Sequence, residues 1–137
     1  MHLPSITAIY LAVLALLYTG LAIQVARLRQ RDRAAFGDNG SRELRSATRA
    51  QGNFIEYVPI ITLMVAFLEM SGLPATRIHL LMGALVLSRL LHPLGMYATS
   101  NTLQFRIGRV GGITLTLVLL IACAVMILWR AWIGTGG

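Results

Sequence analysis

The chain contains no lysine and a single cysteine, and each scarcity excludes a class of site. All twelve basic residues are arginine, so the glycine–lysine loop that cradles nucleotide phosphates is absent. Cys123 has no partner within the chain, which excludes an internal disulfide. It lies in an apolar run, where a small packing residue is the favoured interpretation and a reactive thiol is the alternative.

Metal-binding and nucleophile motifs are also missing. The three histidines (His2, His79 and His92) are scattered, with no His-x-x-x-His or Glu-x-x-His spacing, so we predict no metal site. No nucleophile elbow and no Ser/His/Asp set can be recognised. The net charge of +7 does not indicate nucleic-acid binding, because the arginines flank apolar segments and no binding module is visible.

Apolar sequence is what the chain has in abundance. Of its 137 residues 56% are hydrophobic, and the mean hydropathy of +0.71 is too high for an ordinary soluble domain of this length. A helix that crosses a bilayer needs about 20 mostly apolar residues. Four such runs occur, at about residues 3–26, 41–70, 75–97 and 111–133. We therefore predict an all-α integral membrane four-helix bundle that forms a single domain over residues 1–137.

The arginines are distributed unevenly between these runs, and this predicts the topology. Seven of them lie between the first run and Phe54, where the apolar part of the second run begins, and Arg106 and Arg109 lie between the third and fourth runs. Around the second connection there is one, Arg77. The positive-inside rule then places loops 27–50 and 98–110 in the cytoplasm and both termini on the opposite side. The first run lacks a basic leader and is longer than a signal-peptide core, so we interpret it as a retained helix.

A polar cluster opens the second apolar run. Residues 49–59 read Arg-Ala-Gln-Gly-Asn-Phe-Ile-Glu-Tyr-Val-Pro, and charges at the mouth of a membrane helix are costly enough to indicate a site. Asn53 and Glu56 follow Arg49 by four and seven residues, so at about 100° per residue all three share one helix face. A cation, an amide and an anion together suit a small zwitterionic ligand. A plain interhelical ion pair of Arg49 or Glu56 is the structural alternative.

Further polar residues lie on the other elements that end on the predicted cytoplasmic face: Arg27, Arg89, His92, Tyr97, Arg106 and Arg109. We expect them to converge with the second-helix cluster at one depth. Several arginines around a single carboxylate would favour an anionic ligand and would lower the pKa of a bound thiol. For His92, a satisfied core histidine is an equally open interpretation.

The second-helix segment resembles the signature of the MAPEG family, the membrane-associated proteins in eicosanoid and glutathione metabolism. The matching pattern is Arg-Ala-x-x-Asn-x-x-Glu-x-x-Pro, and the four apolar runs, the basic first loop and the late arginines agree over essentially the whole chain. The family includes microsomal glutathione transferases, leukotriene C synthase and microsomal prostaglandin E synthase. The Arg-x-x-Phe-Gly-Asp segment of the first loop and Gly-Asn-x-x-Glu-Tyr-x-Pro are similar to a bacterial inner-membrane branch of the YecN type.

This resemblance implies a homotrimer of four-helix protomers that binds glutathione between subunits near the cytoplasmic end. The residues it implies for glutathione binding are Arg27, Arg49, Gln51, Asn53, Glu56, Tyr57, Arg89, His92 and Tyr97. Arg106 best matches the family arginine that stabilises the thiolate, and Arg109, one turn away, is the alternative. The proline that is typical near this arginine is absent here, and Gly108 and Gly111-Gly112 occupy the region.

The implied function is that of a glutathione-dependent membrane enzyme of transferase or peroxidase type, acting on a hydrophobic electrophile or lipid from the bilayer. Arginines can clamp the two carboxylates of glutathione, and Glu56 can receive its ammonium group. A non-catalytic glutathione-binding or structural membrane protein is the alternative. A small four-helix transporter is disfavoured, because the first apolar run carries no buried carboxylate. The Gly108–Gly112 spacing also permits close helix approach, which we assign to assembly of the trimer, and a turn from loop to helix is an equal alternative.

Overall fold

The computed structural model describes residues 3–96 and 102–135, so Tyr97 lies outside the described residues. The helices are α1 (Ser5–Arg31), α2 (Arg42–Met70), α3 (Ala75–Met96), α4 (Leu103–Phe105), the π-helical turn η1 (Arg106–Gly111) and α5 (Gly112–Thr135). The last three run on without a break and are called the fourth helix below. Four helices are long and apolar enough to cross a membrane, which confirms the predicted all-α four-helix membrane bundle.

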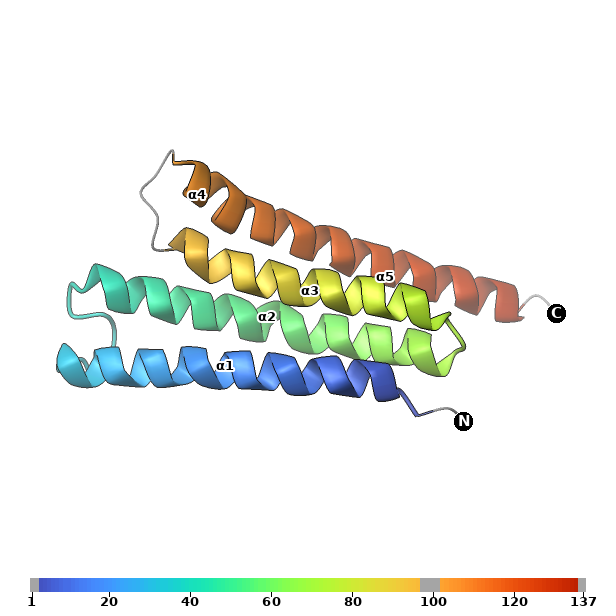
Figure 1. Cartoon of the computed structure of the whole chain (residues 1–137), viewed down its shortest axis with the longest axis horizontal. Helices are drawn as coiled ribbons and strands as arrows, with labels where there is room; N and C mark the ends of the chain where they lie inside the picture. The colour runs from blue at the N-terminus through green and yellow to red at the C-terminus, as the bar shows by residue number, and fades with distance from the viewer. Residues whose placement is uncertain (1–2, 97–101, 136–137) are drawn as a thin grey trace.

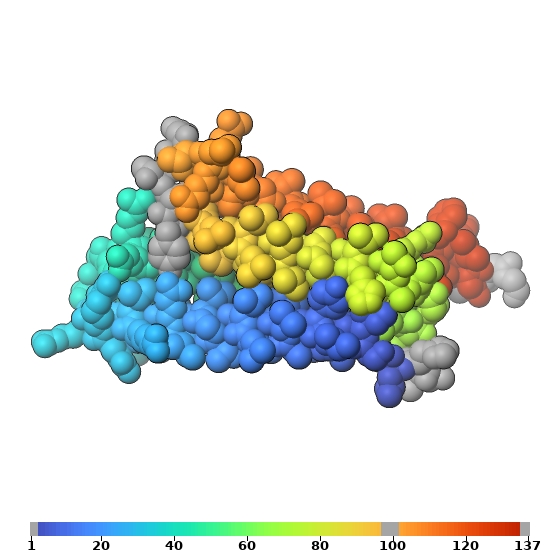
Figure 2. Space-filling view, viewed as in Figure 1, coloured from blue at the N-terminus to red at the C-terminus, as the bar shows by residue number. Residues whose placement is uncertain are grey.

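The helices run antiparallel in turn, and both termini lie at one end of the bundle (Figure 1). We call this the termini end, and we call the end that holds the α1–α2 connection the loop end. The two central helices are α2 and α3; α1 packs on α2, and α5 packs on both. In the space-filling view, the side chains of α1 and α3 meet along one face of the bundle (Figure 2). This arrangement agrees with the predicted topology, although the cytoplasmic assignment of the loop end stays a prediction.

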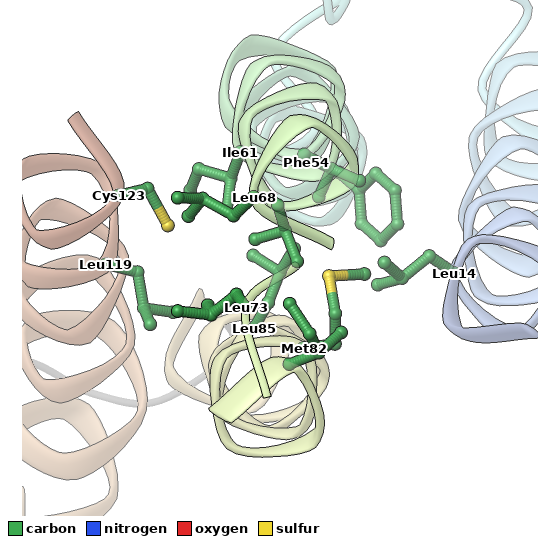
Figure 3. Packing of buried hydrophobic residues seen from close by; sticks show 12 residues of the cluster. Leu14, Phe54, Ile61, Leu68, Leu73, Met82, Leu85, Leu119 and Cys123 are labelled. Atoms are coloured by element: carbon green, nitrogen blue, oxygen red, sulfur yellow. The ribbon is translucent and has the colours of Figure 1, made fainter. Parts of the chain in front are cut away.

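The apolar core lies along the axis of the bundle. Side chains of α2 and α3 meet at its centre, with Leu14 of α1 on one side and Leu119 and Cys123 of α5 on the other (Figure 3). Cys123 is fully buried in this core, in accord with its interpretation as a packing residue. Many large apolar side chains on the outer faces of the bundle are exposed, as expected for helices whose outer surface meets lipid.

Two helix boundaries differ from the sequence prediction. The first helix continues past residue 26 to Arg31, because its basic last turn can stay helical outside the bilayer. The fourth helix begins at Leu103, eight residues before the expected start at 111. The sequence suggested a break at the glycines, but they keep helical conformations and let two backbones pack together. By contrast, the predicted start of α2 is confirmed, since the Ser41 side chain accepts a hydrogen bond from Leu44 N at 3.2 Å.

Acidic residues of the first loop are used to hold that loop in place. Arg31 pairs with Asp32 and with Glu43, each at 2.7 Å, and Arg45 pairs with Asp38 at 2.5 Å. The Arg31 hydrogen bond lowers the pKa of the Asp32 carboxyl group, and the Arg45 hydrogen bond lowers that of Asp38. All three ion pairs found among the described residues lie here, so part of the basic loop serves local structure.

A different carboxylate joins two helices at the termini end. Glu69, near the end of α2, accepts hydrogen bonds from the backbone N–H groups of Ile6 and Thr7, both at 2.9 Å, and from the Thr7 hydroxyl at 2.6 Å. These N–H groups belong to the first turn of α1, where they have no partner within the helix and where the helix dipole favours negative charge. Glu69 therefore acts as an N-terminal cap supplied by another helix.

Candidate functional site

An open cavity of about 640 Å³ lies toward the loop end, between α2, α3 and the fourth helix. Its volume falls within the range of about 300–1,000 Å³ that is usual for small-molecule sites. The residues that line it are Thr48, Arg49, Gly52, Asn53, Glu56, His92, Met96, Arg109 and Ile113. Three helices thus contribute both charged and apolar groups to one hollow.

The α2 side of the cavity carries the predicted second-helix cluster. Arg49, Asn53 and Glu56 all line it, as expected from their shared helix face. Neither Arg49 nor Glu56 takes part in any of the three ion pairs found in the described part of the chain. Within the protomer, the alternative that either residue serves as a plain interhelical ion pair is therefore not realised. A cation and an anion face the same hollow with their charges unneutralised.

The Asn53 side chain is held in place by the buried guanidinium of Arg89. Arg89 of α3 is 3% exposed and donates from Nη1 to the Asn53 side-chain oxygen at 2.7 Å and to its backbone oxygen at 3.2 Å. Its other nitrogens donate to Ser88 Oγ at 3.2 Å and to Thr116 Oγ1. The Arg89 guanidinium thus holds Asn53 Oδ1 and fixes the orientation of this lining residue. Arg89 itself does not line the cavity.

His92 lines the cavity from α3 and carries an unsatisfied atom. The residue is 6% exposed, and its Nδ1 has no hydrogen-bond partner among the described residues. Buried polar atoms without a partner are rare and call for an explanation. Within the described residues His92 is therefore not satisfied at Nδ1, and its role in a binding site stays a prediction.

The two candidate arginines of the fourth helix face different surfaces. Arg109 lines the cavity and lies over the Phe105 ring, 5.5 Å from its centroid. Arg106 instead lines a separate groove of about 680 Å³ on the outer side, together with apolar residues such as Leu91 and Val118. Within one protomer Arg109 therefore joins the α2 cluster, and Arg106 does not.

Backbone contact between glycines sets the position of Arg109. A Cβ on Gly108 would lie 2.5 Å from Gly95 N, and one on Gly95 would lie 2.6 Å from the Gly108 carbonyl carbon. A Cβ on Gly112 would lie 3.2 Å from His92. The Gly108–Gly112 spacing does permit close helix approach, but in this structure the partner is α3 of the same protomer. The spacing therefore gives no independent support for the trimer.

Of the remaining predicted glutathione residues, those in the described ranges do not line the cavity of the single protomer. Arg27 is exposed on α1, which contributes nothing to the lining. Gln51 turns toward α1 and donates to Tyr18 Oη at 3.3 Å. Tyr57 is half-buried against the core. Tyr97 cannot be placed. Their roles stay predictions, as does the intersubunit location of the site.

A basic rim extends the cavity toward the loop end. A second hollow of about 320 Å³ shares Arg49, Met96 and Arg109 with the first and adds Arg42 and Arg45, of which Arg45 is already paired with Asp38. Across both hollows, Glu56 supplies the one carboxylate among the described lining residues. The net field therefore favours an anionic ligand that also carries one cationic group.

Ser88 and Thr116 were missed by sequence reasoning. Both are fully buried, and both accept hydrogen bonds from Arg89. A serine or threonine within an apolar run does not by itself indicate that the residue holds another side chain in place. The buried arginine at position 89 was the available clue, because a guanidinium inside a membrane helix requires acceptors on the helices packed against it.

Comparison with known proteins agrees with this architecture. A sequence model of the MAPEG family matches residues 7–129. The inner membrane protein YecN of Escherichia coli strain K12 is 38% identical over 92 residues, which cover 67% of this chain and 70% of the relative. The same protein from E. coli O6:H1 strain CFT073 matches equally well. No solved structure matches the chain significantly.

Proposed function

The chain belongs to the MAPEG family, and we propose that it binds glutathione in the cavity between α2, α3 and the fourth helix and activates its thiol. The family includes glutathione transferases and peroxidases, so a glutathione-related function in the membrane follows from membership. The relative's name places it in the inner membrane, and the four membrane-spanning helices agree with that location.

The observation that carries the proposal is the set of polar groups facing one cavity. Glutathione has two carboxylates, one ammonium group and one thiol. Arg49 and the basic rim can hold carboxylates, and Glu56 can receive the ammonium group. Asn53 and His92 line the same cavity and add hydrogen-bonding side chains beside these charges. Charge and hydrogen-bonding capacity therefore both match the tripeptide.

Thiol activation requires a cation near the sulfur. A thiol with a pKa near 8.5 is mostly protonated at neutral pH, and a guanidinium nearby lowers that pKa because it stabilises the thiolate. Within the protomer we assign this role to Arg109, because it lines the cavity together with the α2 cluster. Arg106 stays the candidate if the site forms between subunits, because its outward groove would then face a neighbouring copy.

We propose that the thiolate then attacks a hydrophobic electrophile that enters from the bilayer. In a transferase reaction a sulfur–carbon bond forms and the leaving group departs with its electron pair. In a peroxidase reaction the thiolate attacks the terminal oxygen of a hydroperoxide, the oxygen–oxygen bond breaks and an alcohol leaves. A second glutathione then reacts with the sulfenic acid to give glutathione disulfide and water. Both outcomes use the same activated thiol. A non-catalytic glutathione-binding protein is the second candidate, favoured by the fact that the YecN name specifies no reaction.

The test is thiolate formation in purified protein, followed by ultraviolet difference absorbance on addition of glutathione. We expect a saturable thiolate signal in wild type. Arg109→Ala should remove most of it and should slow conjugation of an aryl halide by about one to three orders of magnitude, with glutathione affinity within a few-fold of wild type. Loss in Arg106→Ala alone would assign the role to Arg106. Retention of the signal in both variants would remove these arginines from the chemistry.

A further inference from the structure

Two apolar grooves meet at Arg130, at the termini end of the bundle. One has a volume of about 430 Å³ and runs between α3 and α5, lined by Met126, Trp129 and Ile133 among others. The second has a volume of about 500 Å³ and runs between α2 and α5, lined by residues that include Phe67 and Ile127. Arg130 lines both grooves, so a single cation stands at the point where they join.

The described residues that line the junction carry two positive charges and no negative one. Arg77, at the start of α3, lines the first groove with Arg130. Arg130 Nη2 donates to the Ser71 backbone oxygen, which holds the guanidinium beside the α2–α3 turn. Neither arginine takes part in an ion pair within the described ranges. The nearby Glu69 carboxylate is turned to α1, where it caps that helix.

We propose that this junction binds an anionic phospholipid, with the phosphate between Arg77 and Arg130 and one acyl chain in each groove. The apolar lining excludes a free phosphate as the natural occupant, since such an ion could not use either groove. Trp129 is 65% exposed beside Arg130, and such residues are enriched where a helix meets lipid headgroups. The Arg130 guanidinium is thus held at the depth at which a phosphate would lie.

A second copy of the chain fits the junction less well. The five acidic residues are Asp32, Asp38, Glu43, Glu56 and Glu69. The first four lie at or toward the loop end, and Glu69 is occupied as a cap, so a parallel neighbour offers no free side-chain carboxylate at this depth. Packing of copies here would therefore leave both arginines without a counterion. The lipid site lies at the opposite end from the glutathione cavity and does not depend on it.

The experiment is native mass spectrometry of the full-length protein in detergent, with equimolar phosphatidylglycerol and phosphatidylethanolamine. We expect one phosphatidylglycerol to be retained per protomer in preference to phosphatidylethanolamine. Removal of one guanidinium, in Arg77→Gln or Arg130→Gln, should weaken that retention about five-fold, as expected for a cation near an anionic lipid surface. Arg33→Gln in the first loop removes the same charge at an exposed position and should leave it unchanged.

Three results would overturn the proposal. The first is equal retention of both lipids by wild type. The second is a loss in Arg33→Gln as large as in the two junction variants, which would indicate only general attraction to anionic lipid. The third is dissociation of the assembly in Arg77→Gln with lipid retention unchanged, which would make the junction a subunit interface. Glycerol phosphate at the same concentration should not displace the lipid, and displacement would identify a simple phosphate site.

Discussion

The contact between Gly95 and Gly108 allows a sharp test of the packing that presents Arg109. In Gly108→Ala the added Cβ would lie 2.6 Å from Gly95 Cα, about 1 Å inside the usual carbon–carbon contact distance of about 3.5–4.0 Å. The obstacle is backbone on both sides, so no side chain can swing away. The fourth helix must therefore shift from α3 or lose stability. Overpacking of this kind costs about 1–3 kcal/mol.

Thermal unfolding in detergent measures this cost, and the same helical turn offers a matched control. A Cβ on Gly111 would come no nearer than 3.8 Å, to Arg106 O, which is an ordinary contact. We expect Gly108→Ala to lower the unfolding midpoint by about 3–10 °C. Gly111→Ala should leave it unchanged or raise it slightly, because alanine is favoured over glycine in a helix by about 1 kcal/mol. The thiolate signal that glutathione produces should fall in Gly108→Ala alone, since Arg109 follows the displaced residue directly.

Equal midpoints for the two alanine variants would refute this reasoning about the α3 crossing. A different failure is also informative. If Gly108→Ala dissociated the assembly but left a protomer with an unchanged midpoint, the glycine face would contact a neighbouring subunit. The assignment of that face to packing within the protomer would then be wrong.

Two further predictions concern charged groups outside the cavity. Glu69→Ala removes three hydrogen bonds from the first turn of α1, and because the carboxylate is partly exposed we expect a loss of about 1–2 kcal/mol, measured by thermal unfolding. An unchanged midpoint would show that the cap contributes nothing. Asp32 and Asp38 have a lowered pKa in the folded loop, so their stabilising effect is present above the unfolded carboxyl pKa of about 3.9 and is lost as pH falls through the lower folded value. Pepsin cleavage within residues 32–41 should therefore rise as the pH falls from about 4 to about 2, and Asp38→Asn should be more sensitive to cleavage already at the upper pH. Cleavage that is equal in the two proteins throughout would contradict this.

The sequence was sufficient to predict the bundle and the α2 side of the site. Four apolar runs of membrane length leave few alternatives for the fold, and helical periodicity alone puts Arg49, Asn53 and Glu56 on one face. Those two inferences depend on local spacing, which a sequence states directly.

The other features of the site and the fold depend on how the helices cross, and local spacing in the sequence does not encode these crossings. Arg106 and Arg109 are three residues apart, and only the π-helical turn and the glycine contact with α3 determine which of them faces the cavity. The part played by Thr116 in holding Arg89 likewise requires knowledge of which faces of α3 and α5 meet. The cap formed by Glu69 joins residues 62 and 63 positions apart in the chain. No sequence signal marked it.

The most direct test of the central claim is calorimetric titration of the purified full-length protein with glutathione. We expect saturable binding of glutathione to the wild-type protein. Arg49→Ala and Glu56→Ala should each weaken it by at least ten-fold, because each leaves an opposite charge of the ligand without its partner. Arg33→Ala, at an exposed first-loop position, should bind like wild type. Binding that is unchanged in both cavity variants, or absent from folded wild-type protein, would contradict the assignment of this cavity to glutathione.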